Sequence, residues 1–339
     1  DDGIRDSCTS RGLGDVYKRQ TTNNLSIALF FSAAAWGLFW IPLRQVEALG
    51  ISGSWTVVIF NAIPLIVLIP IFLLTFKKYD ALFRPTIYSA IFIGLAITFY
   101  SKGLVETSVV RATLLFYLTP IWSTIFGIIW LSENLTLTRI ISIIIAFLGM
   151  FLLLSSTNNS GQPLNIGDLY GFLSGIFWGL GATFIKRWSK MSVVTLATLC
   201  FIFTTIYSSF FAIFIYNEAF PILSLVKLSI PIMFFWSIIL LLPSFCTIFF
   251  VSKFLFPGRV AILMMSEVIV AVISASLLIP EEKMFLIQWI GACAIIFAGL
   301  YEVIFSEKRA LKKDNYCLLY TSDAADDSLR VDLGGRRII

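Results

Sequence analysis

The residue of this sequence best placed to do chemistry is Glu267, which lies in the middle of the apolar stretch 258–279. A charged side chain at the centre of a membrane costs about 2.5–3.5 kcal/mol on insertion scales, so Glu267 must face a cavity or a partner. Burial favours the neutral form of a carboxylate, which suits this one to bind a proton or a cationic group of a small molecule. The alternative is a neutral acid that hydrogen-bonds between helices and serves packing alone.

Aromatic side chains form the second group of candidates. Trp36 and Trp40 share one face of a helix because they stand at positions i and i+4. Trp178, Tyr100 and Tyr117 lie in other apolar stretches. Aromatic walls suit a partly apolar organic substrate, and each tyrosine adds a polar group. We therefore predict that these five residues bind substrate together with Glu267; ordinary packing or lipid contact is the alternative for each of them.

Two arginines, Arg111 and Arg259, each lie near the start of an apolar stretch. A positive charge at the beginning of a helix opposes the helix dipole, so another interaction must favour it. One hypothesis is a pair of gate charges that meet anionic groups alternately, which adds Arg111 to the predicted substrate-binding residues. The alternatives are snorkelling to lipid headgroups and, for Arg111, pairing with the nearby Glu106 and Lys102.

Several chemistries find no support in the residue types. The chain has no histidine, and its five cysteines are scattered without a CxxC pair, so neither a metal site nor a disulfide framework is expected. No cofactor is expected. An enzyme would need a convergent set of catalytic groups, which the sequence does not offer. The net charge of +5 is spread over the loops, so no nucleic-acid partner is expected.

The composition predicts a lipid environment for the elements that carry these residues. The chain of 339 residues is 58% hydrophobic and 13% charged, whereas a soluble domain carries about 25% charged residues. We predict an all-α, polytopic membrane protein with ten transmembrane helices, since no segment alternates like a barrel strand. The segments are roughly 25–44, 54–76, 85–103, 108–130, 136–155, 168–187, 192–216, 229–251, 258–279 and 285–305.

The sequence contains two copies of one unit. The stretch 108–133 returns at 256–281 after a shift of 148 residues, with an arginine near its start and a glutamate at its end. The segment WGLFWIPLR at 36–44 returns as WGLGATFIK at 178–186 after a shift of 142. Each half holds five segments, and an odd number sends the second copy through the membrane in the opposite sense. We therefore predict two inverted five-helix repeats.

The predicted boundaries are 21–160 for the first repeat and 161–316 for the second. We expect the two ends, 1–20 and 317–339, to be adaptor-derived and not native, and exclude them from fold reasoning. The hexapeptides DVYKRQ and CLLYTS, one near each end, can be encoded by opposite strands of a single short DNA element. Between the ends, most Lys and Arg residues fall in alternate connections, which predicts that both native termini are cytoplasmic.

From about residue 25 to 306, the sequence resembles the drug/metabolite transporter superfamily, specifically its EamA-type ten-helix permeases. The resemblance rests on the Trp-Gly segment that opens each half and on the acidic residues, Glu133 and Glu281, that end the fourth and ninth segments. Members often have glycine where this chain has Ser132 and Pro280, and proline where it has Val268.

The resemblance implies a permease of the bacterial inner membrane that moves a small organic metabolite by alternating access between the repeats. Amino acids and related compounds are one substrate class, and export is the expected direction. Candidate partners are the small-molecule substrate, a coupling proton, the lipid bilayer and a second copy of the chain. The alternative function is a non-transporting membrane receptor or assembly scaffold, although the short loops offer little recognition surface.

Overall fold

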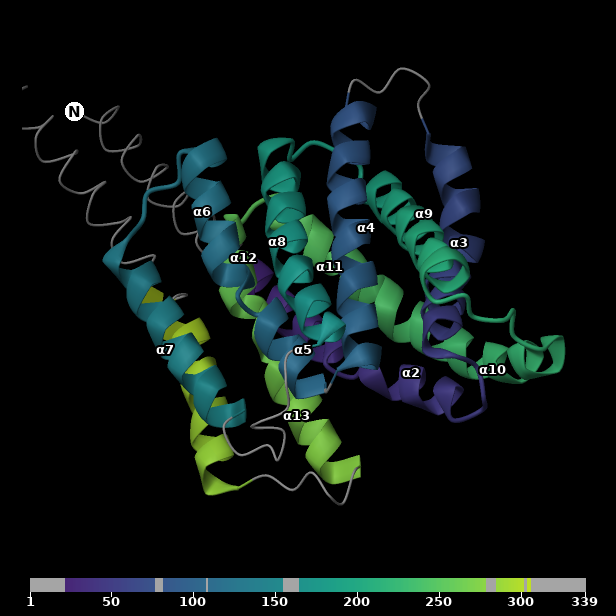
Figure 1. Cartoon of the computed structure of the whole chain (residues 1–339). Coiled ribbons are helices and arrows are strands. Elements are labelled where there is room, and N and C mark those ends of the chain that lie inside the picture. Colours follow the sequence, from purple (N-terminus) through teal and green to yellow (C-terminus); the bar gives the residue numbers. More distant parts are fainter. Residues whose placement is uncertain are drawn as a thin grey trace, which may run out of the picture.

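A computed structural model describes residues 22–76, 82–107, 109–154, 165–278, 285–301 and 304–305. Every regular element within these residues is helical, as the composition predicts (Figure 1). The two ends that we predict to be adaptor-derived lie outside the described residues, and so do most residues of the predicted join between the repeats.

Within the described residues, a helical stretch accompanies each of the ten predicted segments. Several stretches are made of two or three successive elements, because a turn or a π-helical segment interrupts them. In chain order the stretches are Thr22–Glu47, whose last part is α2 (Trp40–Glu47); α3 (Gly53–Thr75); α4 (Phe83–Glu106); α5 (Val109–Phe116) with α6 (Thr119–Leu131); α7 (Leu137–Leu154); α8 (Ile166–Arg187); α9 (Val193–Phe210) with η1 (Phe211–Ile215); α10 (Leu223–Phe235) with η2 (Trp236–Leu241) and α11 (Leu242–Ser252); α12 (Pro257–Met264) with α13 (Ser266–Leu278); and Leu286–Tyr301.

Seven of the described stretches are long and apolar enough to cross a membrane by themselves. Three further apolar helices are shorter, at Thr119–Leu131, Leu137–Leu152 and Leu286–Tyr301. The first of these, α6, follows α5 after a turn of two residues, so the two elements together form the fourth predicted segment. The prediction of a polytopic helical membrane protein is therefore confirmed.

The fourth helix of each repeat is broken at the same place. Tyr117 and Leu118 form the turn between α5 and α6, and Met265 forms the turn between α12 and α13. The shift of 148 residues places Tyr117 on Met265. The break at Met265 forms although Val268 replaces the family's usual proline, because backbone N–H groups there bond three residues back: Met265 to the carbonyl of Ile262 at 3.2 Å and Val268 to that of Met265 at 3.1 Å.

The two broken helices run in opposite senses. In Figure 1, α5 lies below α6 whereas α12 lies above α13. Reversal of equivalent helices is what a repeat with an odd number of membrane crossings requires. The two breaks lie next to each other, since Tyr117 Oη donates to the carbonyl of Met264, the residue before the second break, at 2.9 Å.

Glycines allow the helices around these breaks to approach closely. A Cβ atom added at Gly175 would lie 2.7 Å from the carbonyl oxygen of Phe116, and one added at Gly171 would lie 2.8 Å from that of Ala112. Residues without side chains let α8 lie directly on the backbone of α5. Gly37 brings the first helix onto α13 in the same way, where an added Cβ would meet the backbone of Glu267 and Ala271.

This packing predicts a large effect from a small substitution. We expect Gly37→Ala to lower the free energy of unfolding by about 1–3 kcal/mol, because the new methyl group must displace the backbone of α13. Thermal unfolding in detergent measures the change. Gly299→Ala is the matched control, since its added Cβ has Leu263 Cδ2 3.9 Å away as its nearest neighbour. Equal melting temperatures for the two variants would contradict the close contact at Gly37.

Candidate functional site

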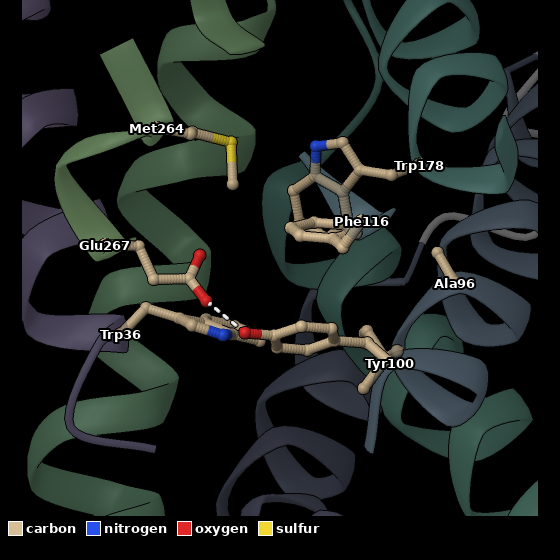
Figure 2. A pocket seen from close by; sticks show the side chains of 8 residues that line it. Trp36, Ala96, Tyr100, Phe116, Trp178, Met264 and Glu267 are labelled. Atoms are coloured by element: carbon tan, nitrogen blue, oxygen red, sulfur yellow. Dashed lines mark hydrogen bonds between the residues drawn. The ribbon is translucent and has the colours of Figure 1, made fainter. Parts of the chain in front are cut away.

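The centre of the molecule holds a carboxylate that is bound by two phenols. Glu267 is 1% exposed and lies in the first turn of α13. Tyr100 Oη donates to Glu267 Oε1 at 2.8 Å, as Figure 2 shows, and Tyr117 Oη lies 2.5 Å from Glu267 Oε2. Both carboxyl oxygens of Glu267 therefore have a hydrogen-bond partner within reach, as a buried acid needs. The Tyr117 hydroxyl also reaches the carbonyl oxygen of Met264, at 2.9 Å.

Local structure explains how these three side chains meet. The break at Met265 starts a new helix just before Glu267, and the free backbone N–H groups of its first turn favour a negative charge there. Tyr117 occupies the equivalent break in the first repeat, so its ring is directed across to the second repeat. Tyr100 reaches the same carboxylate from α4. The site thus joins the fourth helices of both repeats with the third helix of the first.

A small cavity lies beside the carboxylate. Its free space is about 10 Å³, room for about one water molecule. Figure 2 shows Met264 and Glu267 on one side and Trp178, Phe116 and Ala96 on the other. A second cavity of about 10 Å³ adjoins it and shares Trp36, Tyr100 and Glu267. Sites for organic ligands usually measure about 300–1,000 Å³, so neither cavity in this structure is large enough to hold an organic molecule.

Equivalent residues of the two repeats face each other across this cavity. Trp36 and Trp178 are related by the shift of 142 residues, and their ring centroids are 6.4 Å apart. Phe116 and Met264 are related by the shift of 148, and both line the cavity. The pseudo-two-fold relation between the repeats therefore passes through the cavity. Glu267 departs from it, because its equivalent is Thr119, whose hydroxyl donates to the carbonyl of Phe116.

Six of the seven residues predicted to bind substrate are gathered here. Trp36, Tyr100, Trp178 and Glu267 line the first cavity, and Tyr117 holds the carboxylate. The sixth residue, Trp40, lines the second cavity and donates from Nε1 to Ser274 Oγ at 3.0 Å. Their contact with a substrate stays a prediction. The seventh residue, Arg111, lies in α5, but its side chain falls outside the described residues.

One other expectation about a charged residue needs correction. Arg259 does not snorkel to lipid headgroups, because it is 7% exposed and its Nη2 donates to Ser26 Oγ at 3.1 Å. The alternative that Arg111 pairs with Glu106 and Lys102 falls outside the described residues; Lys102 itself is completely buried, with its Nζ 3.1 Å from Glu106 Oε1 in an ion pair.

Four residues that line the first cavity were missed by sequence reasoning: Ala96, Ile97, Phe116 and Met264. For two of them the sequence carried a usable signal, because Phe116 precedes Tyr117 and the shift of 148 residues places it on Met264. Ala96 and Ile97 are apolar residues in an apolar helix, and no pattern distinguishes them from lipid-facing neighbours.

Nothing in the described part of the chain suggests an inorganic centre. Among these residues, no three histidine, cysteine, aspartate or glutamate side chains come together to hold a metal ion. What the centre offers instead is one carboxylate, two phenol groups and an aromatic wall. A carboxylate with phenols binds a proton or a cation, and aromatic side chains cover the apolar surface of a ligand. These groups are suited to binding a ligand reversibly.

The fold and this centre define a class of protein: an integral membrane protein built from two helical repeats, with a polar site enclosed where they meet. The sequence profile of the EamA-like transporter family matches residues 24–155 and again residues 165–304. The chain therefore belongs to the EamA-like transporter family, a group of membrane transporters, and the predicted resemblance is confirmed. The two matches also agree with the predicted duplication.

Solved structures support the same fold. One crystal structure superposes with a TM-score of 0.66 at 15% sequence identity, covering 85% of this chain and 99% of that chain. At this identity the similarity establishes the fold alone. No curated protein sequence matches this chain.

The bonds at the carboxylate lead to a stability prediction. We expect Tyr117→Phe to lower the free energy of unfolding by about 1–3 kcal/mol, because it leaves the buried carboxyl group of Glu267 without one of its two phenol partners while the ring is kept. Thermal unfolding of the purified protein measures the loss. The matched control is Tyr88→Phe, since Tyr88 is 53% exposed. A melting temperature for Tyr117→Phe that equals the control would mean that the phenol does not hold the carboxylate.

Proposed function

We propose that the chain is a permease that moves a small organic molecule through the central cavity by alternating access between the two repeats. Glu267 is the group that binds the molecule or a coupled proton. The observation that supports this proposal best is the position of the carboxylate: it is enclosed between the repeats, it is absent from the equivalent position in the first repeat, and aromatic side chains surround it.

The lining of the site points to the chemistry of the substrate. A carboxylate selects a positively charged or protonated amine, and the faces of Trp36 and Trp178 favour an apolar or cationic body next to it. Amino acids and related amines fit this description. The expected direction is export, which follows from the resemblance to EamA-type permeases rather than from the geometry.

One carboxylate with two competing ligands provides a simple form of coupling. A proton and an ammonium group both neutralise Glu267, and they cannot do so at the same time. The protein alternates between two conformations in this proposal, and each conformation exposes Glu267 to one side of the membrane. Release of one ligand from Glu267 then accompanies binding of the other. A coupling proton is therefore part of the proposal, in exchange for an amine.

The remaining parts of the proposal concern the setting. We place the protein in a bacterial inner membrane with both native termini in the cytoplasm, because basic residues gather in the connections on that side. A homodimer is a further candidate assembly. The competing function, a non-transporting receptor or scaffold, draws support from the small volume of the cavity. It requires that the repeats never separate, whereas a permease must expose Glu267 during its cycle.

Transport in vesicles tests the proposal. The full chain is reconstituted in liposomes, and uptake of labelled amino acids and organic amines is measured with and without a pH gradient. We expect Glu267→Gln to lower the rate of the transported compound by about tenfold or more, because a charge-assisted bond worth about 1.5–3 kcal/mol is lost.

The matched control for this experiment is Glu47→Gln. Glu47 is a partly exposed acid that pairs with Arg44 at 3.5 Å and takes no part in lining either cavity. Its substitution should leave the rate unchanged. Transport by Glu267→Gln at the control's rate, with the same response to a pH gradient, would remove Glu267 from the mechanism.

A further inference from the structure

One hydroxyl group at the central site lies between two acceptors. Tyr117 Oη is 2.5 Å from Glu267 Oε2 and 2.9 Å from the carbonyl oxygen of Met264. The Tyr117 side chain is 1% exposed. A phenol has a single hydrogen and donates one bond at a time, although its oxygen can also accept one. Which of the two oxygens receives the hydrogen therefore depends on whether Glu267 carries a proton.

The Met264 carbonyl needs this donor because the helix is broken beside it. In an unbroken α-helix, the N–H of Val268 would bond to the carbonyl of Met264, four residues earlier. Here the Val268 N–H bonds to the carbonyl of Met265 at 3.1 Å. Met264 is 3% exposed, and a buried carbonyl without a donor is costly. Tyr117, from the first repeat, thus completes the hydrogen bonding at the helix break of the second.

Ionised Glu267 leaves one of the two acceptors without the hydrogen of Tyr117. A carboxylate can only accept hydrogen bonds, and a charge-assisted bond from a phenol is stronger than a bond to a neutral carbonyl. The Tyr117 hydrogen then turns to Glu267. As a consequence, the carbonyl of Met264 loses its donor from the first repeat.

A proton on Glu267 removes the competition. The acid hydrogen on Oε2 donates to Tyr117 Oη, and the phenol hydrogen donates to the carbonyl of Met264. Oε1 still accepts from Tyr100 Oη at 2.8 Å. These three contacts are therefore satisfied at the same time only when Glu267 is neutral.

The immediate surroundings of Glu267 agree with a neutral acid. Among the residues that the structure describes, no ion pair includes Glu267. Its partners are the phenols of Tyr100 and Tyr117, and the indole rings of the first helix and α8 line the cavity beside it. A buried carboxyl group without a counter-charge is far more stable neutral than ionised.

Charged residues of the surrounding helices have partners elsewhere or stand at helix ends. Lys102 and Glu106 of α4 pair with each other at 3.1 Å, and Arg259 of α12 bonds to Ser26. The charged residues of α8 and of the first helix lie in the first or last turn of each helix. The side chain of Arg111, in α5, lies outside the described residues. Among the described side chains, the two phenols are therefore the titratable partners of Glu267.

We propose that Tyr117 is a hydrogen-bond switch that links the proton on Glu267 to the helix break at Met264 and Met265. Protonation completes the bond from Tyr117 to Met264 and stabilises the enclosed packing of the two repeats seen here. Ionisation draws the hydroxyl to Glu267 and weakens this packing, so an empty, ionised Glu267 does not stay enclosed. Tyr117 acts as a positioning residue. The inference rests on the proposed transport function, in which Glu267 releases its proton to bind an amine.

Access to the first cavity measures how tightly the repeats pack. Ala96 lines this cavity and is 1% exposed. The full chain with Ala96→Cys is reconstituted in liposomes and treated with N-ethylmaleimide, a small neutral thiol reagent that crosses membranes. Mass spectrometry of the peptide that contains residue 96 gives the labelling rate, so the native cysteines do not interfere. Every variant carries Ala96→Cys, so the pH response of the thiol itself cancels when rates are divided.

Glu267→Gln holds the switch in its proton-bound setting, because the amide N–H donates to Tyr117 as the acid does. The quantity of interest is the labelling rate with Glu267 intact, divided by the rate with Glu267→Gln. We expect this ratio to be close to unity at about pH 6 and to rise about tenfold by about pH 10, as Glu267 ionises and Met264 loses its donor. A ratio that stays constant with pH overturns the proposal.

Tyr117→Phe should flatten this pH response to about twofold or less, because no hydroxyl then links Glu267 to Met264. A residue that serves packing alone would raise the rate at every pH and keep the response. Tyr100→Phe is the matched control and should keep it, since Tyr100 donates to the same carboxyl group but has the Thr113 hydroxyl, at 3.5 Å, as its other neighbour. A full response in Tyr117→Phe, or its loss in both variants, overturns the switch.

Infrared spectroscopy keeps the proposal testable if Tyr117→Phe does not fold. Methionine labelled with the heavy stable isotope at its carbonyl carbon separates the methionine carbonyls from all others, and Met264→Leu identifies the band of Met264. A carbonyl that loses a hydrogen-bond donor absorbs at higher frequency. We expect this upward shift at high pH in the chain with Glu267 and its absence in Glu267→Gln. A Met264 band that is independent of pH in both proteins overturns the switch.

The outcomes separate this inference from the transport function. Neither labelling nor infrared spectroscopy needs a substrate. A pH response that depends on Tyr117, in a protein that transports none of the tested compounds, would support the switch and refute the permease. Transport that depends on Glu267, together with a full pH response in Tyr117→Phe, would refute the switch alone.

Discussion

A carboxylate in the middle of a membrane needs hydrogen-bond donors, and the rest of this structure depends on how Glu267 obtains them. Its donors, Tyr100 and Tyr117, come from the opposite repeat and lie more than a hundred residues earlier in the chain. They reach it only because the fourth helix of each repeat breaks near its middle and because the glycines of α8 and Gly37 let backbones touch. The close helix packing, the two helix breaks and the hydrogen bonds from the phenols therefore all serve to hold one side chain, Glu267.

The duplication gives the protein a symmetric frame around an asymmetric centre. Trp36 lies against Trp178, and Phe116 lines the same cavity as Met264, yet the equivalent of Glu267 in the first repeat is Thr119, whose hydroxyl donates to the carbonyl of Phe116. In the proposed transport cycle, the aromatic walls exchange roles when the repeats move, while the single carboxylate stays with the second repeat.

Much of this could be predicted from the sequence. Long apolar runs predicted the helices, matching motifs predicted the duplication, and a lone acid in an apolar run predicted Glu267 as the centre. Periodicity could not predict the partners, because a bond such as that from Tyr100 to Glu267 depends on how helices are rotated and packed. The same limit applies to Lys102, whose enclosure by Glu106, Ser54 and Tyr216 could not be predicted from sequence distance.

Chemical modification of Glu267 tests the central claim most directly. An apolar carbodiimide dissolves in the bilayer and reacts with protonated carboxylic acids that become accessible there, and mass spectrometry locates the adduct. If Glu267 opens to ligands at the meeting point of the repeats, it is modified in liposomes, and a transported amine slows its modification. An adduct that never forms at Glu267, while exposed acids react normally, would show that this carboxylate stays enclosed and serves the fold alone.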